Sequence, residues 1–180
     1  TMRRTLAALG MTEELSFSFT SEKTLDKLGV PADSPLRQAI PIMNPLTDEY
    51  PLIRTTLLTS VLENAARNVA RKNMDLRLFD IAPVFFPKAL PVTELVEEKC
   101  KVAGLLTGRR NPIAWDTDNA MVDFYDMKGI LERFLTAIGV QKYTVERGEH
   151  FAMHPGKTAF FKKGRDVIAT LGEIHPTVAA

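Results

Sequence analysis

The sequence predicts an α+β domain that contains a mostly antiparallel sheet. Two long segments, residues 55–71 and 123–138, have the apolar spacing of amphipathic helices. Segments rich in β-branched and aromatic residues alternate irregularly with them, and a short turn at residues 163–166 joins the last two. Because that connection is a hairpin and not a helical crossover, these strands are expected to pair antiparallel. We expect a single domain over residues 1–180.

The N-terminal part of the chain predicts short elements. Residues 2–9 have helical spacing, and residues 13–19 (EELSFSF) alternate at period two, as in a half-buried strand. Ser21 is placed to cap a short helix, which Gly29 would close. A proline-interrupted stretch at residues 36–46 then predicts extended backbone and a turn.

The helix expected at residues 55–71 has an unusual polar face. Its apolar residues share one side, and Thr55 or Thr56 is available as N-cap. The opposite side carries the residues Ser60, Asn64, Arg67, Asn68 and Arg71. Asparagine is a poor helix former, so the two asparagines in the middle of this helix indicate that some interaction compensates for them.

Strands are predicted on both sides of the second long helix. Residues 76–86 (LRLFDIAPVFF) have the composition of a core strand, and Pro83 predicts a bulge or an edge position there. Residues 100–108 form the next strand, in which the single cysteine, Cys100, is expected to be buried. The remaining strands are expected at residues 142–147 and in a hairpin over residues 158–174.

The helix at residues 123–138 is the most regular one. Asp123 or Asp126 is placed to start this helix, and Gly139 is placed to end it. The two acids could form a charged site with Lys128. We prefer the interpretation that they cap the helix, because carboxylates are favourable at a helix N-terminus.

Composition gives no sign of a general nucleic-acid- or membrane-binding role, although a local basic patch could be hidden by the balanced total charge. The formal net charge is +1 and the isoelectric point is about 7.8, which gives no general electrostatic footprint for nucleic acid or membrane. A single cysteine cannot form a disulfide framework and favours a reducing compartment. No apolar run approaches the roughly 20 residues that span a bilayer. We therefore expect a soluble, cytoplasmic protein.

The usual catalytic motifs do not occur in the sequence. Its glycines form neither a dinucleotide-binding nor a P-loop signature, and no nucleophile elbow is present. His154 and His175 each precede a proline, and with Glu173 they make one plausible zinc ligand set. The simpler interpretation is that each His-Pro pair ends a strand. The basic residues around Phe160 and Phe161 suggest nucleic acid, but we prefer a hairpin with one phenylalanine in the core.

The order of several short segments is more informative than any one of them. The segments are NPLTDEYPLIRTTLLTSVLENAARN, LRLFDIAPVFF, VDFYDMKGILERFL, HPGKTAFF and LGEIHP, after an opening RRTLAALGMTEELSFSFTS. Together they cover most of the chain and resemble the catalytic-like domain of the bacterial phenylalanyl-tRNA synthetase β subunit. The resemblance implies a class II aminoacyl-tRNA synthetase-like fold, in which helices flank an antiparallel sheet.

The resemblance also implies what the domain does and what it lacks. In this family the α subunit makes phenylalanyl-adenylate from phenylalanine and ATP, with Mg²⁺, and charges tRNA(Phe), while the β domain has lost the active site. The chain agrees, because it has no F-R-x-E segment and no G-x-G-x-x-R segment. We therefore assign no catalytic, cofactor-binding or metal-binding residue. We expect an excised fragment of a longer β subunit, a non-catalytic structural core within a heterotetramer.

A role for the unusual polar face follows from the same resemblance. Class II folds build subunit interfaces from a long helix and the strand behind it, which correspond here to residues 55–71 and 76–85. We therefore expect docking against the α subunit or the second β subunit through Asn64, Arg67, Asn68 and Arg71. The alternative is an ordinary hydrated surface.

Two other functions stay open at this point. One is a metal-assisted hydrolase built on His154, Glu173 and His175, and the other is a regulatory binding module derived from a synthetase paralogue. Metal analysis would separate the first from a structural role. Co-purification with the α subunit would separate the second.

Overall fold

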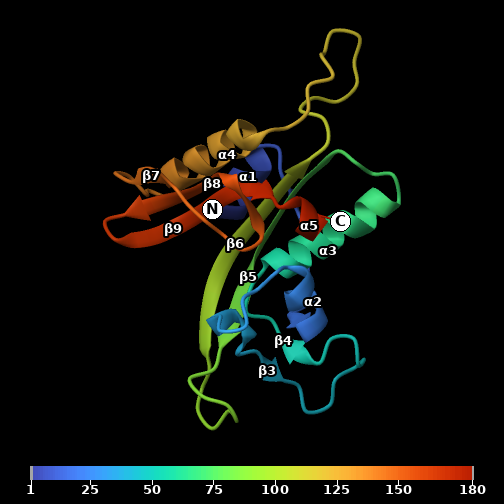
Figure 1. The fold of residues 1–180 in the computed structure, drawn as a ribbon. Helices are drawn as coiled ribbons and strands as arrows, with labels where there is room; N and C mark the ends of the chain where they lie inside the picture. Colours follow the sequence, from blue (N-terminus) through green and yellow to red (C-terminus); the bar gives the residue numbers. More distant parts are fainter. Residues whose placement is uncertain (1, 180) are drawn as a thin grey trace.

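The computed structural model describes residues 2–179. Figure 1 shows its helices and strands, and no helix within the described residues is long and apolar enough to cross a bilayer. In chain order the elements are α1 (Met2–Ala8), β1 (Thr12–Glu13), β2 (Phe19–Thr20), α2 (Glu22–Lys27), a 3-10 helix (Pro35–Arg37), β3 (Ile40–Pro41), β4 (Leu52–Ile53), α3 (Leu58–Ala70), β5 (Leu76–Phe86), β6 (Glu97–Thr107), α4 (Phe124–Ala137), β7 (Thr144–Arg147), β8 (Met153–Lys163), β9 (Asp166–Ile174) and α5 (Pro176–Ala179).

The strands form three sheets of three strands each, in the orders β1-β5-β6, β2-β4-β3 and β7-β8-β9. β1 runs parallel to β5, and the other strand pairs are antiparallel. The expected α+β class with mostly antiparallel pairing is therefore confirmed. The strands are divided among three small sheets, a division that the sequence did not predict.

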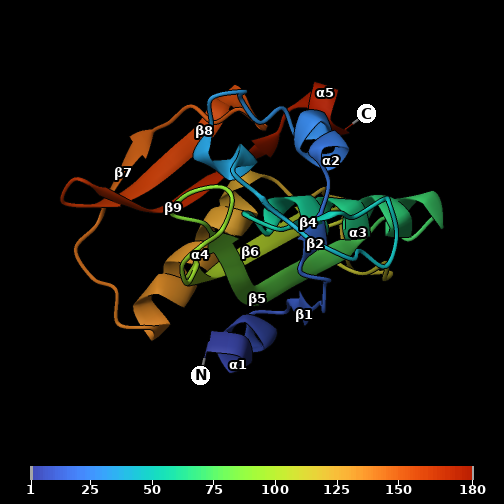
Figure 2. The same cartoon turned by 90° about the horizontal axis from the view of Figure 1, so that it is seen from below.

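The long ribbon of β5 and β6 lies between two helical layers. Alternate residues of a strand point to opposite faces, and Phe79 joins a core cluster with Leu6 of α1 and Phe134 of α4. On the opposite face, Leu78 clusters with Ala65 of α3. Figure 2 shows α1 and α3 on opposite sides of this ribbon. Full burial of each large apolar side chain contributes about 1.5–3 kcal/mol, so both faces of β5 help to hold the helices.

Two further clusters attach the rest of the chain. Leu135 of α4 packs with Phe161 of β8 and Leu171 of β9, which places α4 between the ribbon and the C-terminal sheet. Leu25 of α2 packs with Ala152, just before β8. The N-terminal and C-terminal parts of the chain are therefore in contact on the side of α2.

Several predicted elements occur where they were expected. β5 has the bounds predicted for it, and Pro83 lies in an unbroken β5–β6 ladder beyond the stretch that β1 covers, so its position is an edge and not a bulge. The Asp123 carboxylate caps α4, and the Asp126 carboxylate accepts the Asp123 N–H at 2.8 Å. Gly164, with φ of 65°, makes the predicted turn between β8 and β9.

The prediction of one continuous strand over residues 13–19 is wrong. Its two ends form the separate two-residue strands β1 and β2, because the chain leaves β5 after Glu13 and crosses to β4. The stretch at residues 36–46 is extended only in part. It contains the end of the 3-10 helix and the short strand β3.

Two local expectations are also corrected. The N-cap of α3 is Leu57, later than the predicted Thr55 or Thr56, although the Thr56 hydroxyl accepts the backbone N–H of Leu58 at 3.2 Å. Cys100 is exposed and not buried, because it lies in the first half of β6, where residues 97–102 are all exposed to solvent.

Candidate subunit interface

The connection between β1 and β2 turns its polar side chains toward the core and its apolar side chains toward solvent, the reverse of an ordinary half-buried strand. Glu14 is only 6% exposed, whereas Leu15 and Phe17 are 93% and 83% exposed. The ring of Phe17 stacks on that of Phe19, with centroids 6.5 Å apart. An extended segment over a core usually turns its apolar side inward. Here the polar side is inward, and we name the outward side chains of Leu15, Phe17 and Phe19 the apolar strip.

Arg54 holds the polar side of this connection in place. Its side chain is 1% exposed and follows directly after β4. Arg54 Nη1 donates to the Ser16 hydroxyl at 2.7 Å and to the Phe17 carbonyl at 3.2 Å, and Nε donates to the Pro83 carbonyl at 3.0 Å. The Ser16 hydroxyl also donates to the Asp80 carboxylate. Because these bonds fix the polar side against β4 and β5, the apolar strip is left facing outward.

The charges in this cluster are buried and paired. Arg54 Nη1 lies 3.7 Å from the Asp80 carboxylate, and both side chains are almost fully removed from water. Burial lowers the pKa of the Arg54 guanidinium, and the Asp80 charge opposes that shift. Arginine is not deprotonated in proteins, so Arg54 stays a cation. Removing one partner of such a pair leaves an uncompensated buried charge, at a cost of about 3–5 kcal/mol.

A row of amides on α3 explains the two asparagines in its middle. The Asn64 side-chain amide donates to the Glu14 carboxylate. The Asn68 amide donates to the Asn64 backbone carbonyl at 2.9 Å and to its side-chain oxygen at 3.1 Å, and Asn73 donates to Asn68 at 3.2 Å. The hydrogen bonds that compensate for the low helix propensity of these asparagines are therefore made within the domain. Ser60, on the same side, is also buried.

Glu14 is the least satisfied member of this network. Its second carboxylate oxygen, Oε1, has no hydrogen-bond partner among the described residues. Burial raises the pKa of Glu14, the Asn64 bond opposes that shift, the Asp80 charge adds to it, and Arg67 opposes it. A buried carboxylate with one free oxygen is a source of instability at neutral pH, and this one lies directly beneath the apolar strip.

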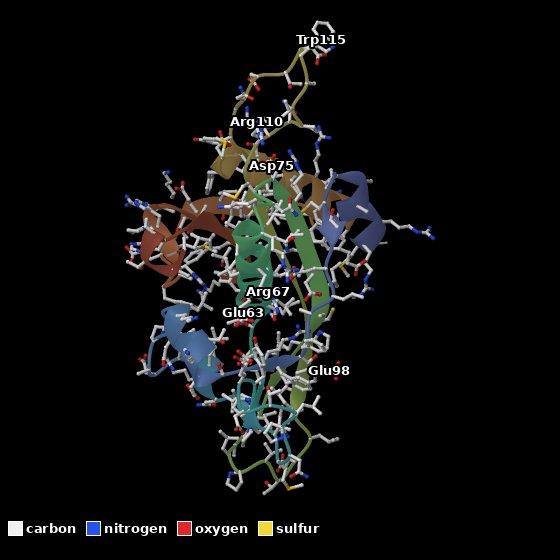
Figure 3. The ribbon with its side chains drawn as sticks, turned by 90° about the vertical axis from the view of Figure 1, so that its right-hand side faces the viewer. Glu63, Arg67, Asp75, Glu98, Arg110 and Trp115 are labelled. Atoms are coloured by element: carbon white, nitrogen blue, oxygen red, sulfur yellow. The ribbon has the colours of Figure 1, made fainter. Side chains whose placement is uncertain are left out.

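The four residues expected at a subunit interface divide into two kinds. Asn64 and Asn68 are half-buried and bonded within the domain, whereas Arg67 and Arg71 are exposed. Figure 3 labels Arg67 beside α3, near Glu63, whose carboxylate accepts the Thr24 hydroxyl of α2 at 3.0 Å. The Asn64 bond to Glu14 joins this helical face to the inward side of the β1–β2 connection. Contact of the four residues with another subunit stays a prediction.

The structure does not assemble the metal set considered for a hydrolase. The rings of His154 and His175 stack with centroids 6.2 Å apart, but the Glu173 carboxylate is paired with Lys157. His154 Nδ1 accepts the Gly156 N–H at 3.1 Å, so it serves a local turn. Within residues 2–179, no group of three or more potential ligands is placed to hold a metal ion. The hydrolase alternative is therefore not favoured.

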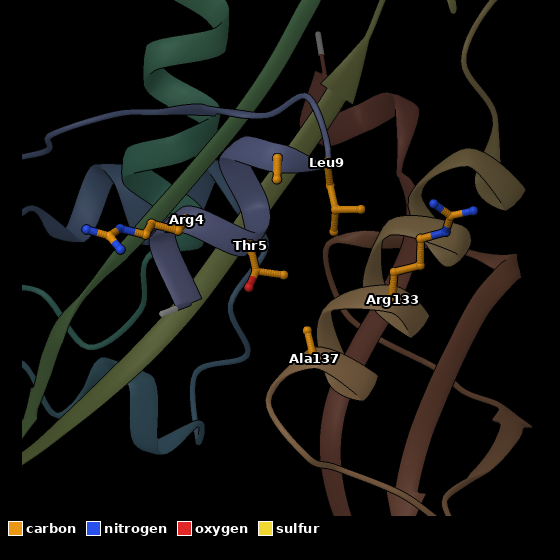
Figure 4. Close-up of a pocket in the computed structure, with 6 residues that line it drawn as sticks. Arg4, Thr5, Leu9, Arg133 and Ala137 are labelled. Carbon is orange, nitrogen blue, oxygen red and sulfur yellow. The ribbon is translucent and has the colours of Figure 1, made fainter.

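A hollow of about 450 Å³ lies between α1 and α4, lined by Arg4, Thr5, Ala8, Leu9, Arg133 and Ala137. Figure 4 shows the guanidinium groups of Arg4 and Arg133 on opposite sides of it, pointing away from each other. A triphosphate needs cations or backbone N–H groups that converge on its oxygens. The residues of this hollow do not fit ATP.

The arrangement of helices around the β5–β6 ribbon is that of a class II aminoacyl-tRNA synthetase domain. Two structures of pyrrolysyl tRNA synthetase from Desulfitobacterium hafniense share this fold, with TM-scores of 0.62 and 0.65. They match 94% and 97% of this chain and 54% and 58% of their own chains. Their identity to this chain is 15%, so the likeness shows the fold alone.

The chain belongs to the family of the phenylalanyl tRNA synthetase beta chain CLM domain, whose family model matches residues 1–180. Phenylalanine–tRNA ligase beta subunits from Syntrophotalea carbinolica and Geobacter metallireducens are 39% and 36% identical to it, over 99% and 98% of this chain. The chain spans about a fifth of the length of these relatives, 22% in each case. The family resemblance found in the sequence is thus confirmed.

Sequence reasoning missed the apolar strip. Alternation predicts that one side of a strand is buried, but it does not say which side faces the core. The overlooked signal is that Glu14, Ser16 and Ser18 alternate as regularly as the apolar residues. Their inward partner, Arg54, is distant in the sequence, so only the fold brings these groups together.

Proposed function

We propose that this domain is a non-catalytic, structural part of a phenylalanine–tRNA ligase β subunit. In this role it supports the α subunit in the ATP-dependent attachment of phenylalanine to tRNA(Phe). The observation that carries the proposal is the apolar strip, with Leu15 and Phe17 almost fully exposed. Aromatic and aliphatic side chains gathered on a surface mark a protein–protein interface. Membership of the β-chain family supplies the identity of the complex.

The proposed interface joins the apolar strip to the polar face of α3. The Asn64–Glu14 bond ties α3 to the inward side of the connection that carries the strip, and Arg67 and Arg71 of α3 are exposed. An apolar centre with a polar rim is the usual anatomy of an interface. We therefore extend the proposed contact with the α subunit or a second β subunit to these arginines.

The catalytic groups of the proposed complex belong to the α subunit. ATP, Mg²⁺ and the activated phenylalanine would be held there, and tRNA(Phe) would bind the assembled cytoplasmic enzyme. Two features of this chain support that division of labour. The hollow between α1 and α4 has no converging cations for phosphates, and the buried Arg54 is already occupied by Asp80.

The proposal is tested by charging assays on the full-length β subunit mixed with its α subunit. The double variant Leu15→Ser, Phe17→Ser should lose phenylalanine attachment at low subunit concentration and regain it when the β chain is in excess, because mass action restores the complex. Val167→Ser, at an exposed site on β9, is the matched control and should leave charging unchanged. Formation of phenylalanyl-adenylate by this chain alone would overturn the proposal.

A further inference from the structure

The loop between β6 and α4 has a fixed base. The Arg110 N–H donates to the Ala120 carbonyl at 2.8 Å, and the Val122 N–H donates to the Gly108 carbonyl at 3.0 Å. These two bonds bring the ends of the loop together as a short ladder. The loop therefore leaves the body of the domain in a defined direction.

Ion pairs strengthen the same base. The Arg110 guanidinium lies 3.3 Å from the Asp123 carboxylate and 2.9 Å from that of Asp126, the two acids that cap α4. Arg109 pairs at 3.1 Å with Asp75, which lies just before β5. The base of the loop is thus tied to both α4 and β5. Figure 3 shows Arg110 and Asp75 near the foot of the loop.

The far end of the loop is shaped by a hydroxyl and presents a single large aromatic ring. The Thr117 hydroxyl accepts the Ala114 N–H at 3.1 Å and donates to the Pro112 carbonyl at 3.0 Å. Trp115, the only tryptophan of the chain, is 98% exposed, and Ile113 is 73% exposed. Figure 3 shows Trp115 at the tip, beyond every other labelled residue. The turn therefore forms without any contribution from the indole ring.

The negative charge at the tip of the loop indicates which kind of partner fits it. Residues 111–119 contain Asp116 and Asp118 and no lysine or arginine. Proteins that stack bases on an aromatic ring combine it with cations for the phosphates. Two carboxylates beside Trp115 would instead repel phosphates. A protein pocket with an apolar floor and basic residues at its rim complements both the ring and the acids.

Building on the proposed function, we propose that Trp115 is a docking residue that inserts into an apolar, basic-rimmed pocket of the α subunit of the ligase. Tryptophan is over-represented among the residues that dominate binding energy, and a turn that is already formed loses little conformational freedom on binding. The base of the loop is paired with Asp75, just before β5. The connection that carries the apolar strip is held by Arg54, which bonds to Pro83 in the second half of β5. The Trp115 contact is therefore separate from the apolar strip.

The proposal predicts protection of Trp115 in the assembled enzyme. Hydroxyl-radical labelling of exposed aromatic side chains in the full-length β subunit, read by mass spectrometry, should modify Trp115 readily before the α subunit is added and about ten-fold more slowly afterwards. Tyr125, exposed on the first turn of α4, is the internal control and should react equally in both states. Equal reactivity of Trp115 before and after assembly would overturn the proposal.

Substitution tests the energetic role of the ring. Trp115→Ala should weaken association of the full-length subunits about 30-fold, as for a dominant interface residue, and Trp115→Phe should weaken it less. Thermal unfolding should be unchanged by either substitution, because the ring has no packed neighbours to lose. Unchanged affinity for Trp115→Ala would contradict the docking role even if the apolar strip is essential, so this proposal and the proposed function can fail separately.

Charge reversal separates a protein partner from a nucleic acid. Asp116→Lys should slow association of the subunits, because it opposes the basic rim of the pocket. If the loop instead contacts tRNA, the same change should tighten binding of tRNA(Phe) and leave association of the subunits unaltered. That second result would refute the proposed protein pocket.

Discussion

The guanidinium of Arg54 lies 3.7 Å from the carboxylate of Asp80, and the two side chains are only 1% and 4% exposed. Arg54 follows β4 and Asp80 lies in the middle of β5, so this pair connects the small sheet to the central ribbon. The Ser16 hydroxyl bonds to both groups. A buried charge pair therefore determines which side of the β1–β2 connection faces the solvent.

Arg54→Met should destabilise the domain by about 3–5 kcal/mol, because it leaves the Asp80 carboxylate buried without a partner. The double variant Arg54→Met, Asp80→Leu should recover much of that loss, since both charges are then absent. Urea unfolding of the wild-type chain and the variants measures each free energy. Equal stability of the single and double variants would show that the pair is not coupled.

Asn64→Ala should lower the free energy of unfolding by about 1–3 kcal/mol, because it removes a hydrogen bond to a buried carboxylate. Arg71→Ala, at the exposed C-terminal end of α3, is the control and should stay within about 0.5 kcal/mol of the wild type. If both variants are equally stable, the Asn64 amide does not stabilise Glu14. The presence of Asn64 in the middle of α3 would then have to be explained by contact with a partner subunit.

Glu14→Gln should change the pH dependence of stability. Burial raises the pKa of Glu14 above the ordinary value of 4.5, so the folded state holds its proton more tightly than the unfolded state. The contribution of Glu14 to the free energy of unfolding therefore falls as pH rises from about 4.5 through the raised pKa, and is constant above it. The variant lacks this titration, so its stability relative to wild type should increase with pH over that window.

Urea unfolding of both proteins from about pH 4 to pH 8 measures this difference. Other carboxylates, such as Asp75 and Asp126, have lowered pKa values and stabilise the fold as pH rises. They occur in both proteins and cancel in the comparison. Parallel profiles for variant and wild type would contradict a raised pKa at Glu14.

Gly108→Ala should be among the most damaging single substitutions in the chain. Gly108 has φ of 82°, and an added Cβ would lie 2.5 Å from the Met74 carbonyl oxygen. We expect a loss above about 3 kcal/mol from the steric clash and the left-handed backbone. Gly129→Ala is the control, because nothing lies within 4 Å of its added Cβ, and it should stabilise α4 by up to about 1 kcal/mol. Thermal unfolding of the two variants distinguishes these outcomes.

The elements that the sequence predicted well are those whose signals are local. The α4 helix carries its own capping acids, Asp123 and Asp126, and the β8–β9 hairpin carries Gly164 at its turn. Residues 76–86 have strand composition throughout, and β5 has those bounds. Such signals need no knowledge of the rest of the fold.

The features that the sequence did not predict depend on distant partners. The inward direction of Ser16 follows from Arg54 and Asp80, which lie far along the chain. The asparagines of α3 indicated a missing interaction, and Glu14 supplies it within the domain. Cys100 was expected to be buried from its apolar neighbours, but its part of β6 is open to solvent. Periodicity reports which residues share a side, and tertiary contacts decide which side is buried.

The most direct test of the structural role is the dissociation constant between the full-length β and α subunits. We predict that Leu15→Ser with Phe17→Ser raises this constant on the order of 100-fold, since two dominant interface side chains are lost. The control Val167→Ser should leave it unchanged. Wild-type affinity in the double variant would show that the apolar strip does not bind the α subunit.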